Sequence, residues 1–153
     1  HALKQQVEAA NFGEKTRDGM DLALCALQPL NAGMSLIYAG ANRPLYHIRE
    51  GVLQEIKATK QSIGGADEGE ARIYAAHELI LNKADAFYIF SDGYADQFSA
   101  EDKKLMTKRF KELLLEVQPL PMVEQEKRLR DFFMEWRSGA EQTDDVLVIG
   151  VRV

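Results

Sequence analysis

The sequence has little cysteine, no excess of positive charge and no long apolar run, and each shortage excludes a class of protein. One cysteine, Cys25, cannot form an internal disulfide, which favours a reduced, cytosolic setting. Lys and Arg total 19 against 24 Asp and Glu, so the basic footprint of a general nucleic-acid binder is missing. No apolar stretch approaches the ~20 residues of a membrane span. We therefore expect a cytoplasmic chain that binds no nucleic acid and has no membrane segment of its own, although a longer parent could be anchored through other domains.

The chain has the size and composition of one globular domain. It has 153 residues, of which 46% are hydrophobic and 28% charged, as in ordinary folded domains. It has no initiator methionine, and its first ten residues carry Leu3, Val7 and Ala10 at helical spacing. We interpret these residues as the tail of a helix, and the chain as a piece of a larger protein.

The apolar pattern predicts an α+β fold. Ala86–Phe90 is wholly apolar, which predicts a central strand covered on both faces, and Val146–Val153 predicts a buried last strand. Short turns between successive strands predict antiparallel pairing, and Thr59–Glu70 is predicted to be a loop. Strands are predicted over 19–27, 34–39, 45–49, 52–58, 71–81, 86–90 and 146–153, and helices over 100–117 and 121–137.

Acidic residues stand where two of these strands end or begin. Asp92 and Gly93 follow the apolar strand 86–90, and Asp144 and Asp145 precede the last strand. Carboxylates at the ends of adjacent strands could converge on one Mg²⁺ or Mn²⁺ ion, since these ions prefer oxygen ligands. The spacing alone leaves two other readings open, because Asp-Gly is a common turn and an Asp pair is often a solvated loop.

The remaining polar motifs indicate turns and core positions rather than catalytic or metal sites. Asp18 and Gly19 read as a turn before a strand, Asp21 is expected to face solvent or a partner, and Cys25 is expected in the core. The histidines do not cluster, and the sequence lacks the HExxH, CxxC and GxSxG motifs. Zinc hydrolase and serine hydrolase functions therefore lack their motifs.

Four segments in order resemble successive motifs of the bacterial PPM-type (type 2C-like) metal-dependent protein phosphatases, and the branch they resemble most is the stage II sporulation protein E family. Any one motif is weak, but their shared order and spacing are specific, and the resemblance covers essentially the whole chain. The segments are Asp18–Cys25 (DGMDLALC), Tyr38–Leu45 (YAGANRPL), Phe90–Gly93 (FSDG) and Thr143–Val146 (TDDV).

The resemblance implies an α-β-β-α sandwich of mostly antiparallel sheets flanked by helices, with two Mn²⁺ or Mg²⁺ ions. It implies hydrolysis of phosphoserine or phosphothreonine by a metal-bound water. The substrate would be a phosphorylated bacterial signalling protein, with an anti-sigma-factor antagonist as the family's example. By motif position, Asp92 and Asp144 resemble metal ligands, and the supporting residues are Gly93, Asp145, Asp18 and Asn42.

The chain departs from the family pattern in ways that bear on activity. The family's first metal motif, of the type Asp-x-x-Gly-His-Gly, has no counterpart, so residues 1–153 are interpreted as a partial, N-terminally truncated phosphatase domain without its first strands. Ala41 stands where other branches carry an aspartate of a third metal site. We expect an active parent, and weak or no activity from this chain alone.

An alternative remains open, in which the chain or its parent is an inactive pseudophosphatase that serves as a binding or dimerisation module. An incomplete sandwich would expose strand edges and an apolar face. We therefore expect a homo-oligomer formed through the strands Gly19–Leu27 and Met34–Ala39, which would neighbour the missing ones. We also expect the carboxylates of Asp92 and Asp144 to point into one shared pocket.

Overall fold

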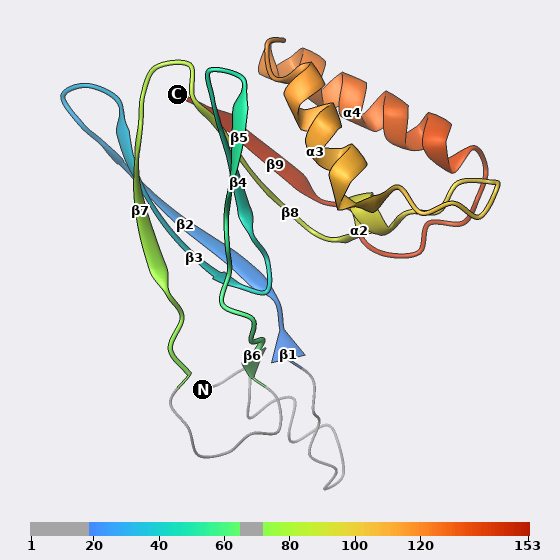
Figure 1. Ribbon diagram of the computed structural model, residues 1–153, viewed down its shortest axis with the longest axis horizontal. Helices are drawn as coiled ribbons and strands as arrows, with labels where there is room; N and C mark the ends of the chain where they lie inside the picture. The colour runs from blue at the N-terminus through green and yellow to red at the C-terminus, as the bar shows by residue number, and fades with distance from the viewer. Residues whose placement is uncertain (1–18, 65–71) are drawn as a thin grey trace, which may run out of the picture.

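The structure is a computed structural model that describes residues 19–64 and 72–153 (Figure 1). Its main parts form three layers: the sheet β2-β3-β7, the sheet β5-β4-β8-β9, and a layer of helices. The strands are β1 (Gly19–Met20), β2 (Leu22–Pro29), β3 (Met34–Ala41), β4 (Leu45–Arg49), β5 (Val52–Ile56), β6 (Ile63–Gly64), β7 (Ala76–Leu81), β8 (Ala86–Phe90) and β9 (Val148–Arg152), and the helices are α2 (Gly93–Asp96), α3 (Met106–Val117) and α4 (Met122–Arg137). The predicted α+β class, with mostly antiparallel sheets, is confirmed.

The three-stranded sheet is antiparallel, and its outer face carries apolar side chains together with Ser35 and Glu78. β2 pairs with β3 from Leu22 opposite Ala41 to Pro29 opposite Met34, and β3 pairs with β7 on its other side. Because side chains alternate between faces, Leu36 and Tyr38 point inward and are fully buried, whereas Ile37 between them is 46% exposed. No helix covers the outer face among the residues that the structure describes.

The four-stranded sheet lies in the middle, and β8 is buried on both of its faces. Phe87 packs into a core shared with the three-stranded sheet, together with Leu36 and Tyr38. Tyr88, the next residue, points the other way into a core shared with α3 and α4. The prediction that Ala86–Phe90 is a central, doubly covered strand is therefore confirmed.

Helices α3 and α4 pack on the outer face of this sheet (Figure 1). Their sequences place apolar residues three and four positions apart, which gives each helix one apolar stripe. The buried residues of these stripes are Phe110, Leu113, Leu114 and Val117 of α3 and Leu129 and Phe133 of α4. None of the described helices is long and apolar enough to cross a membrane.

Several predicted details differ in the structure. β9 was expected to be buried, but it is the edge strand of its sheet, and Ile149 is 43% exposed. β3 lies between β2 and β7, so unlike β2 it has no free edge to offer a partner. The apolar pattern of residues 121–137 predicts that Val123 faces inward, but it is 78% exposed because it lies in the first turn of α4, beyond the sheet-facing stripe.

Element boundaries also shift. The predicted loop 59–70 contains the two-residue strand β6, which pairs with β1. The predicted strand 71–81 begins only at Ala76, and the predicted helix 100–117 only at Met106. Gly93, expected to turn the chain, instead begins the short helix α2. The expected helix tail over the first ten residues lies outside the described residues.

Candidate functional site

Asp92 stands just beyond the end of the central strand β8, where the chain enters α2. Its backbone is helical, with φ −71° and ψ −22°, and its carboxylate makes no capping hydrogen bond to the helix. Instead, Oδ2 lies 2.7 Å from Nη1 of Arg43, and the side chain is 41% exposed. A carboxylate on a rigid strand end, open to solvent on one side, is placed to bind a further group.

The segment that carries Asp144 and Asp145 is latched to the end of β8 by Ser91. The Ser91 hydroxyl donates a hydrogen bond to the Asp145 carbonyl oxygen at 2.7 Å and accepts one from the Leu147 N–H at 2.9 Å. The Ser91 N–H donates to the Leu147 carbonyl oxygen at 3.0 Å. These bonds continue the β8–β9 pairing outward and bring the two acidic motifs side by side.

Gly93 permits this close approach. A Cβ atom built on Gly93 would lie 2.5 Å from the Asp145 carbonyl oxygen and 3.3 Å from the Asp144 carbonyl carbon. Both contacts are with backbone, which cannot swing aside as a side chain can. The supporting role expected of Gly93 therefore has a steric basis, which is close packing of two backbone segments rather than a sharp turn.

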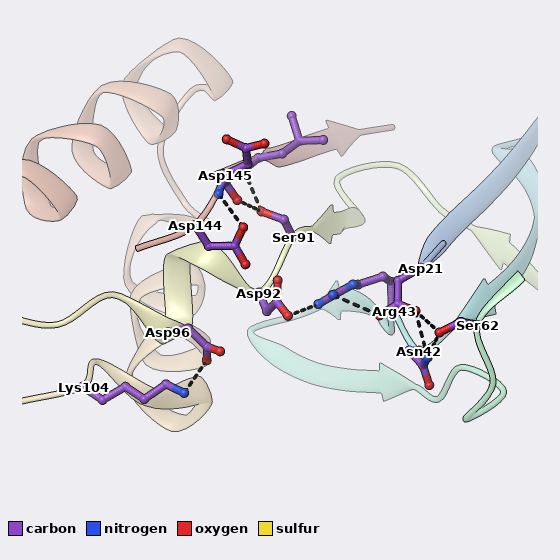
Figure 2. Close-up of polar contacts among 11 residues, drawn as sticks. Asp21, Asn42, Arg43, Ser62, Ser91, Asp92, Asp96, Lys104, Asp144 and Asp145 are labelled. Carbon is purple, nitrogen blue, oxygen red and sulfur yellow. Dashed lines mark hydrogen bonds and ion pairs between the residues drawn. The ribbon is translucent and has the colours of Figure 1, made fainter. Parts of the chain in front are cut away.

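The two aspartates of the second motif point in different directions (Figure 2). The Asp144 carboxylate lies on the side of Asp92, and its Oδ1 accepts a hydrogen bond from the Asp145 N–H at 2.7 Å. The Asp145 carboxylate points away from Asp92. Asp92 and Asp144 are therefore the pair that could share a ligand, while Asp145 supports the segment through its backbone.

The donor set suits one hard cation. Mg²⁺-like ions are commonly held by one or two carboxylates, with waters and substrate phosphates completing the shell, and Asp92 and Asp144 supply such a pair. Within residues 19–64 and 72–153, no group of three or more His, Cys, Asp or Glu side chains is placed to hold a metal. The described residues thus fit one ion and are too few for two.

A pocket shared by Asp92 and Asp144 stays a prediction. An open groove of about 690 Å³ runs between α4 and β9, with Met122, Leu129 and Val148 among its lining residues, but neither Asp92 nor Asp144 lines it. The two acids lie at an exposed end of the sheet instead.

A second polar network holds Arg43 from the other side (Figure 2). Asp21 Oδ2 lies 3.1 Å from Arg43 Nη2, and Asp21 Oδ1 accepts hydrogen bonds from Asn42 Nδ2 at 2.9 Å and from Ser62 Oγ at 2.6 Å. The hydrogen bonds from Asn42 and Ser62, with the charge of Arg43, hold the pKa of Asp21 below its ordinary value against the effect of partial burial. Asp21, expected to face solvent or a partner, is fixed in this network.

The sequence alone did not indicate a role for Arg43 or Ser62. Ala41 of the motif YAGANRPL is buried and offers no donor, whereas Arg43 of the same motif reaches the acidic pair. Asn42, expected as a supporting residue, donates a hydrogen bond to Asp21. The available signal was an arginine in the turn between two strands, beside a motif already marked. Asp18 lies outside the described residues.

The layers are those of a phosphatase fold of the PPM class, and the comparisons with solved structures agree. The chain is 27% identical to the SiaA-PP2C domain of Pseudomonas aeruginosa, with a TM-score of 0.68 over 78% of this chain and 46% of that one. The phosphatase domain of SpoIIE from Bacillus subtilis gives 17% identity and a TM-score of 0.57 over 87% of this chain and 56% of that one.

A third similar fold is the PPM Ser-Thr phosphatase MsPP from Mycobacterium smegmatis, at 16% identity and a TM-score of 0.60 over 99% of this chain and 70% of that one. No curated protein matches the sequence. A sequence model of the family described as Stage II sporulation protein E matches residues 2–153. The chain belongs to this family, and it spans about half the length of the first two solved domains named above.

Proposed function

We propose that residues 1–153 are the C-terminal portion of a metal-dependent protein serine/threonine phosphatase domain. The observation that carries the proposal is the juxtaposition of Asp92 and Asp144, which the Ser91 latch and the Gly93 contact bring together at one end of the central sheet. Family membership supports it, and the two acidic motifs resemble those that carry metal ligands in this family.

In the proposed site, Asp92 and Asp144 would hold Mn²⁺ or Mg²⁺. When bound, such ions supply an activated water and neutralise charge on a phosphoryl group. The chain itself contributes geometry. β8 anchors Asp92 through Phe87 and Tyr88, which are buried on opposite faces, and the backbone of Asp145 keeps Asp144 beside it. Further ligands for a second ion would come from the part of the domain that precedes this chain in its relatives.

The proposed substrate is a phosphoserine or phosphothreonine in a bacterial signalling protein. The family analogy points to a phosphorylated anti-sigma-factor antagonist in the cytoplasm. Two features of this chain are compatible with a protein substrate: the acidic pair lies at an exposed end of the sheet, and Asp92 is 41% exposed. A phosphorylated side chain on a folded partner could therefore reach it.

The proposal is tested by comparing this chain with the full-length parent protein in Mn²⁺-dependent hydrolysis of p-nitrophenyl phosphate and of a phosphoserine peptide. We expect turnover by the parent and little or none by this chain, because two carboxylates are too few for two ions. In the parent, Asp92→Asn should reduce kcat about 100-fold or more. Asp96→Asn is the matched control, since Asp96 lies one helical turn away and pairs with Lys104 instead.

Turnover by the 153-residue chain that Asp92→Asn abolishes would contradict the incomplete-site argument. A parent without activity under all Mn²⁺ and Mg²⁺ conditions would contradict the phosphatase proposal.

A second candidate function, a dimerisation module, is favoured by one observation. The outer face of the β2-β3-β7 sheet exposes apolar side chains around the hydrogen-bonded pair Ser35 and Glu78. Leu24 is 61%, Ile37 46% and Ile80 50% exposed. The register and alternation of the strands place all three on the same face. We propose that a second copy of the chain covers this face, an assembly that is compatible with phosphatase activity in the parent.

A further inference from the structure

The Asp92 carboxylate is held by Arg43, which lies in the turn between β3 and β4, and not by the helix that Asp92 itself precedes. It makes no capping hydrogen bond to α2, and Arg43 Nη1 binds its Oδ2 at 2.7 Å. The other terminal nitrogen of the same guanidinium, Nη2, lies 3.1 Å from Asp21 Oδ2. Arg43 thus bridges Asp92 in the four-stranded sheet and Asp21 beside the three-stranded sheet (Figure 2).

The turn between β3 and β4 is built to aim Arg43 in this direction. The Tyr38 hydroxyl donates a hydrogen bond to the Arg43 carbonyl oxygen. Gly40 leaves room for that bond, because a Cβ there would lie 2.5 Å from the Arg43 carbonyl oxygen and would overlap the Tyr38 hydroxyl. Asn42 adopts φ 59°, a left-handed conformation that asparagine tolerates better than most residues.

The far end of the bridge is fixed equally well. Asp21 is held by Asn42 and Ser62 through hydrogen bonds of 2.9 and 2.6 Å, so it does not depend on Arg43 for its position. The Arg43 side chain itself is 23% exposed. A guanidinium with one carboxylate fixed on one side is pre-organised to fix a second carboxylate on the other.

We infer that Arg43 is a positioning residue for Asp92, and that the motif YAGANRPL exists to aim it. This inference rests on the proposed function. With Oδ2 held by Arg43, the Asp92 side chain has one rotamer and its second oxygen, Oδ1, remains available to a cation. Hydrogen-bonded partners behind metal ligands orient those ligands, and their loss typically weakens metal binding by 10- to 100-fold.

Lysine cannot replace arginine fully at this position. A lysine ammonium is a compact charge on a flexible stem, whereas the guanidinium presents separate N–H donors in a rigid plane to the two carboxylates. Arg43→Lys should keep the charge and lose the simultaneous contact, so its Mn²⁺ affinity should fall between those of the wild type and Arg43→Met. This ordering separates positioning from simple charge balance.

The test measures Mn²⁺ binding to the full-length parent by electron paramagnetic resonance of free Mn²⁺, for wild type, Arg43→Lys, Arg43→Met and the control Lys104→Met. Lys104 forms a comparable ion pair with Asp96, at 3.0 Å, at the other end of α2. We expect the Kd for Mn²⁺ to rise about tenfold in Arg43→Met, less in Arg43→Lys, and not in Lys104→Met. Circular dichroism and thermal unfolding establish that each variant is folded.

Kinetics with a phosphopeptide then distinguish positioning from direct substrate binding. If Arg43 acts through Asp92, added Mn²⁺ restores the kcat of Arg43→Met, and KM for the peptide stays near the wild-type value. A raised KM that Mn²⁺ does not correct would overturn the inference and make Arg43 a phosphate ligand. Folded Arg43→Met with wild-type or tighter Mn²⁺ binding would also overturn it. A wild-type parent that neither binds Mn²⁺ nor hydrolyses phosphoester would instead remove the proposed function itself.

Discussion

Ser91 and Asp145 are joined by a hydrogen bond of 2.7 Å from the Ser91 hydroxyl to the Asp145 carbonyl oxygen, across 54 residues of sequence. The same hydroxyl accepts the Leu147 N–H, so one oxygen both donates to and accepts from the segment that enters β9. The consequence is that the position of Asp144 relative to Asp92 depends on the residue before Asp92. Ser91 therefore positions Asp144 relative to Asp92 through its hydrogen bonds to the backbone, without itself binding a metal ion.

Ser91→Ala should loosen this junction. It removes a donor and an acceptor, and we expect a loss of about 1–2 kcal/mol in the free energy of unfolding, from two hydrogen bonds at a partly exposed site. Mn²⁺ binding by the parent should weaken several-fold because Asp144 is less fixed. Urea unfolding and Mn²⁺ titration measure the two effects. Ser99→Ala is the control, since Ser99 hydrogen-bonds only to nearby backbone N–H groups at Glu101 and Lys103 through its hydroxyl; equal effects of both variants would contradict the latch.

Gly93→Ala should damage the site more than the fold. The new Cβ would lie 2.5 Å from the Asp145 carbonyl oxygen, and the Asp144 segment must move away to accommodate it. Overpacking of this kind costs about 1–3 kcal/mol. We expect phosphatase activity of the parent to fall at least tenfold while the circular dichroism spectrum is retained. Activity within twofold of wild type would show that the segment carrying Asp144 can move aside without loss of catalysis.

The opposite end of β8 carries a buried charge that should make stability depend on pH. Asp85 is 3% exposed, and it accepts hydrogen bonds from Arg49 Nε at 3.0 Å and from the Asn82 N–H at 2.8 Å. His47 Nε2 lies 3.2 Å from its Oδ2. Burial raises the pKa of Asp85, but the hydrogen bonds from Arg49 and Asn82, the nearby His47 ring and the charge of Arg49 together lower it by more, so the pKa lies below its ordinary value.

A lowered pKa in the folded state means that the ionised form stabilises the fold. This contribution is complete above the ordinary aspartate pKa of about 3.9 and is lost as the pH falls through the lowered folded value. Asp85→Asn should therefore cost about 1.5–3 kcal/mol at neutral pH, because the buried side chain loses its charge-assisted hydrogen bonds to Arg49, whose side chain is 41% exposed, and to the Asn82 N–H. The cost should shrink in acid, and urea unfolding between pH 3 and pH 7 measures it. A loss of unfolding free energy in Asp85→Asn that does not change with pH would contradict the lowered pKa of Asp85.

The sequence predicts the strands, helices and acidic motifs of this fold well, and the reasons are local. Wholly apolar Ala86–Phe90 has one reasonable place, in the middle of a sheet, and the acids that follow it must stand at the sheet's end. The position of β9 at an edge could not be predicted, because the same apolar run serves a buried or an edge strand. Arg43 was missed because its partners, Asp21 and Asp92, are 22 and 49 positions away in sequence and meet it only when the sheets pack together.

Ala84 is held in a conformation that suits glycine. Its φ is 73°, in the left-handed region, which costs an L-residue with a Cβ about 1–2 kcal/mol. Ala84→Gly should therefore raise the free energy of unfolding by about 1 kcal/mol, less the added entropy of the unfolded chain. Ala86→Gly, two residues on in the buried strand, should instead destabilise the protein. Thermal unfolding compares the two; a shift in the same direction for both would contradict the argument.

The exposed face of the three-stranded sheet should set the oligomeric state. Leu24 is 61% exposed and lies on the same face as Ile37 and Ile80, on a sheet whose edge strand β2 is also free among the described residues. We expect the chain to sediment as a dimer at micromolar concentration, and Leu24→Lys to weaken the dimer about tenfold or more, because a half-exposed leucine contributes roughly 1.5 kcal/mol when covered.

Val52→Lys is the matched control: Val52 is 68% exposed on β5 of the other sheet, so its charge should leave the dimer intact. A wild-type chain that sediments as a monomer and unfolds cooperatively would show that this face needs no partner, and a dimer that Val52→Lys disrupts and Leu24→Lys does not would place the interface on the other sheet.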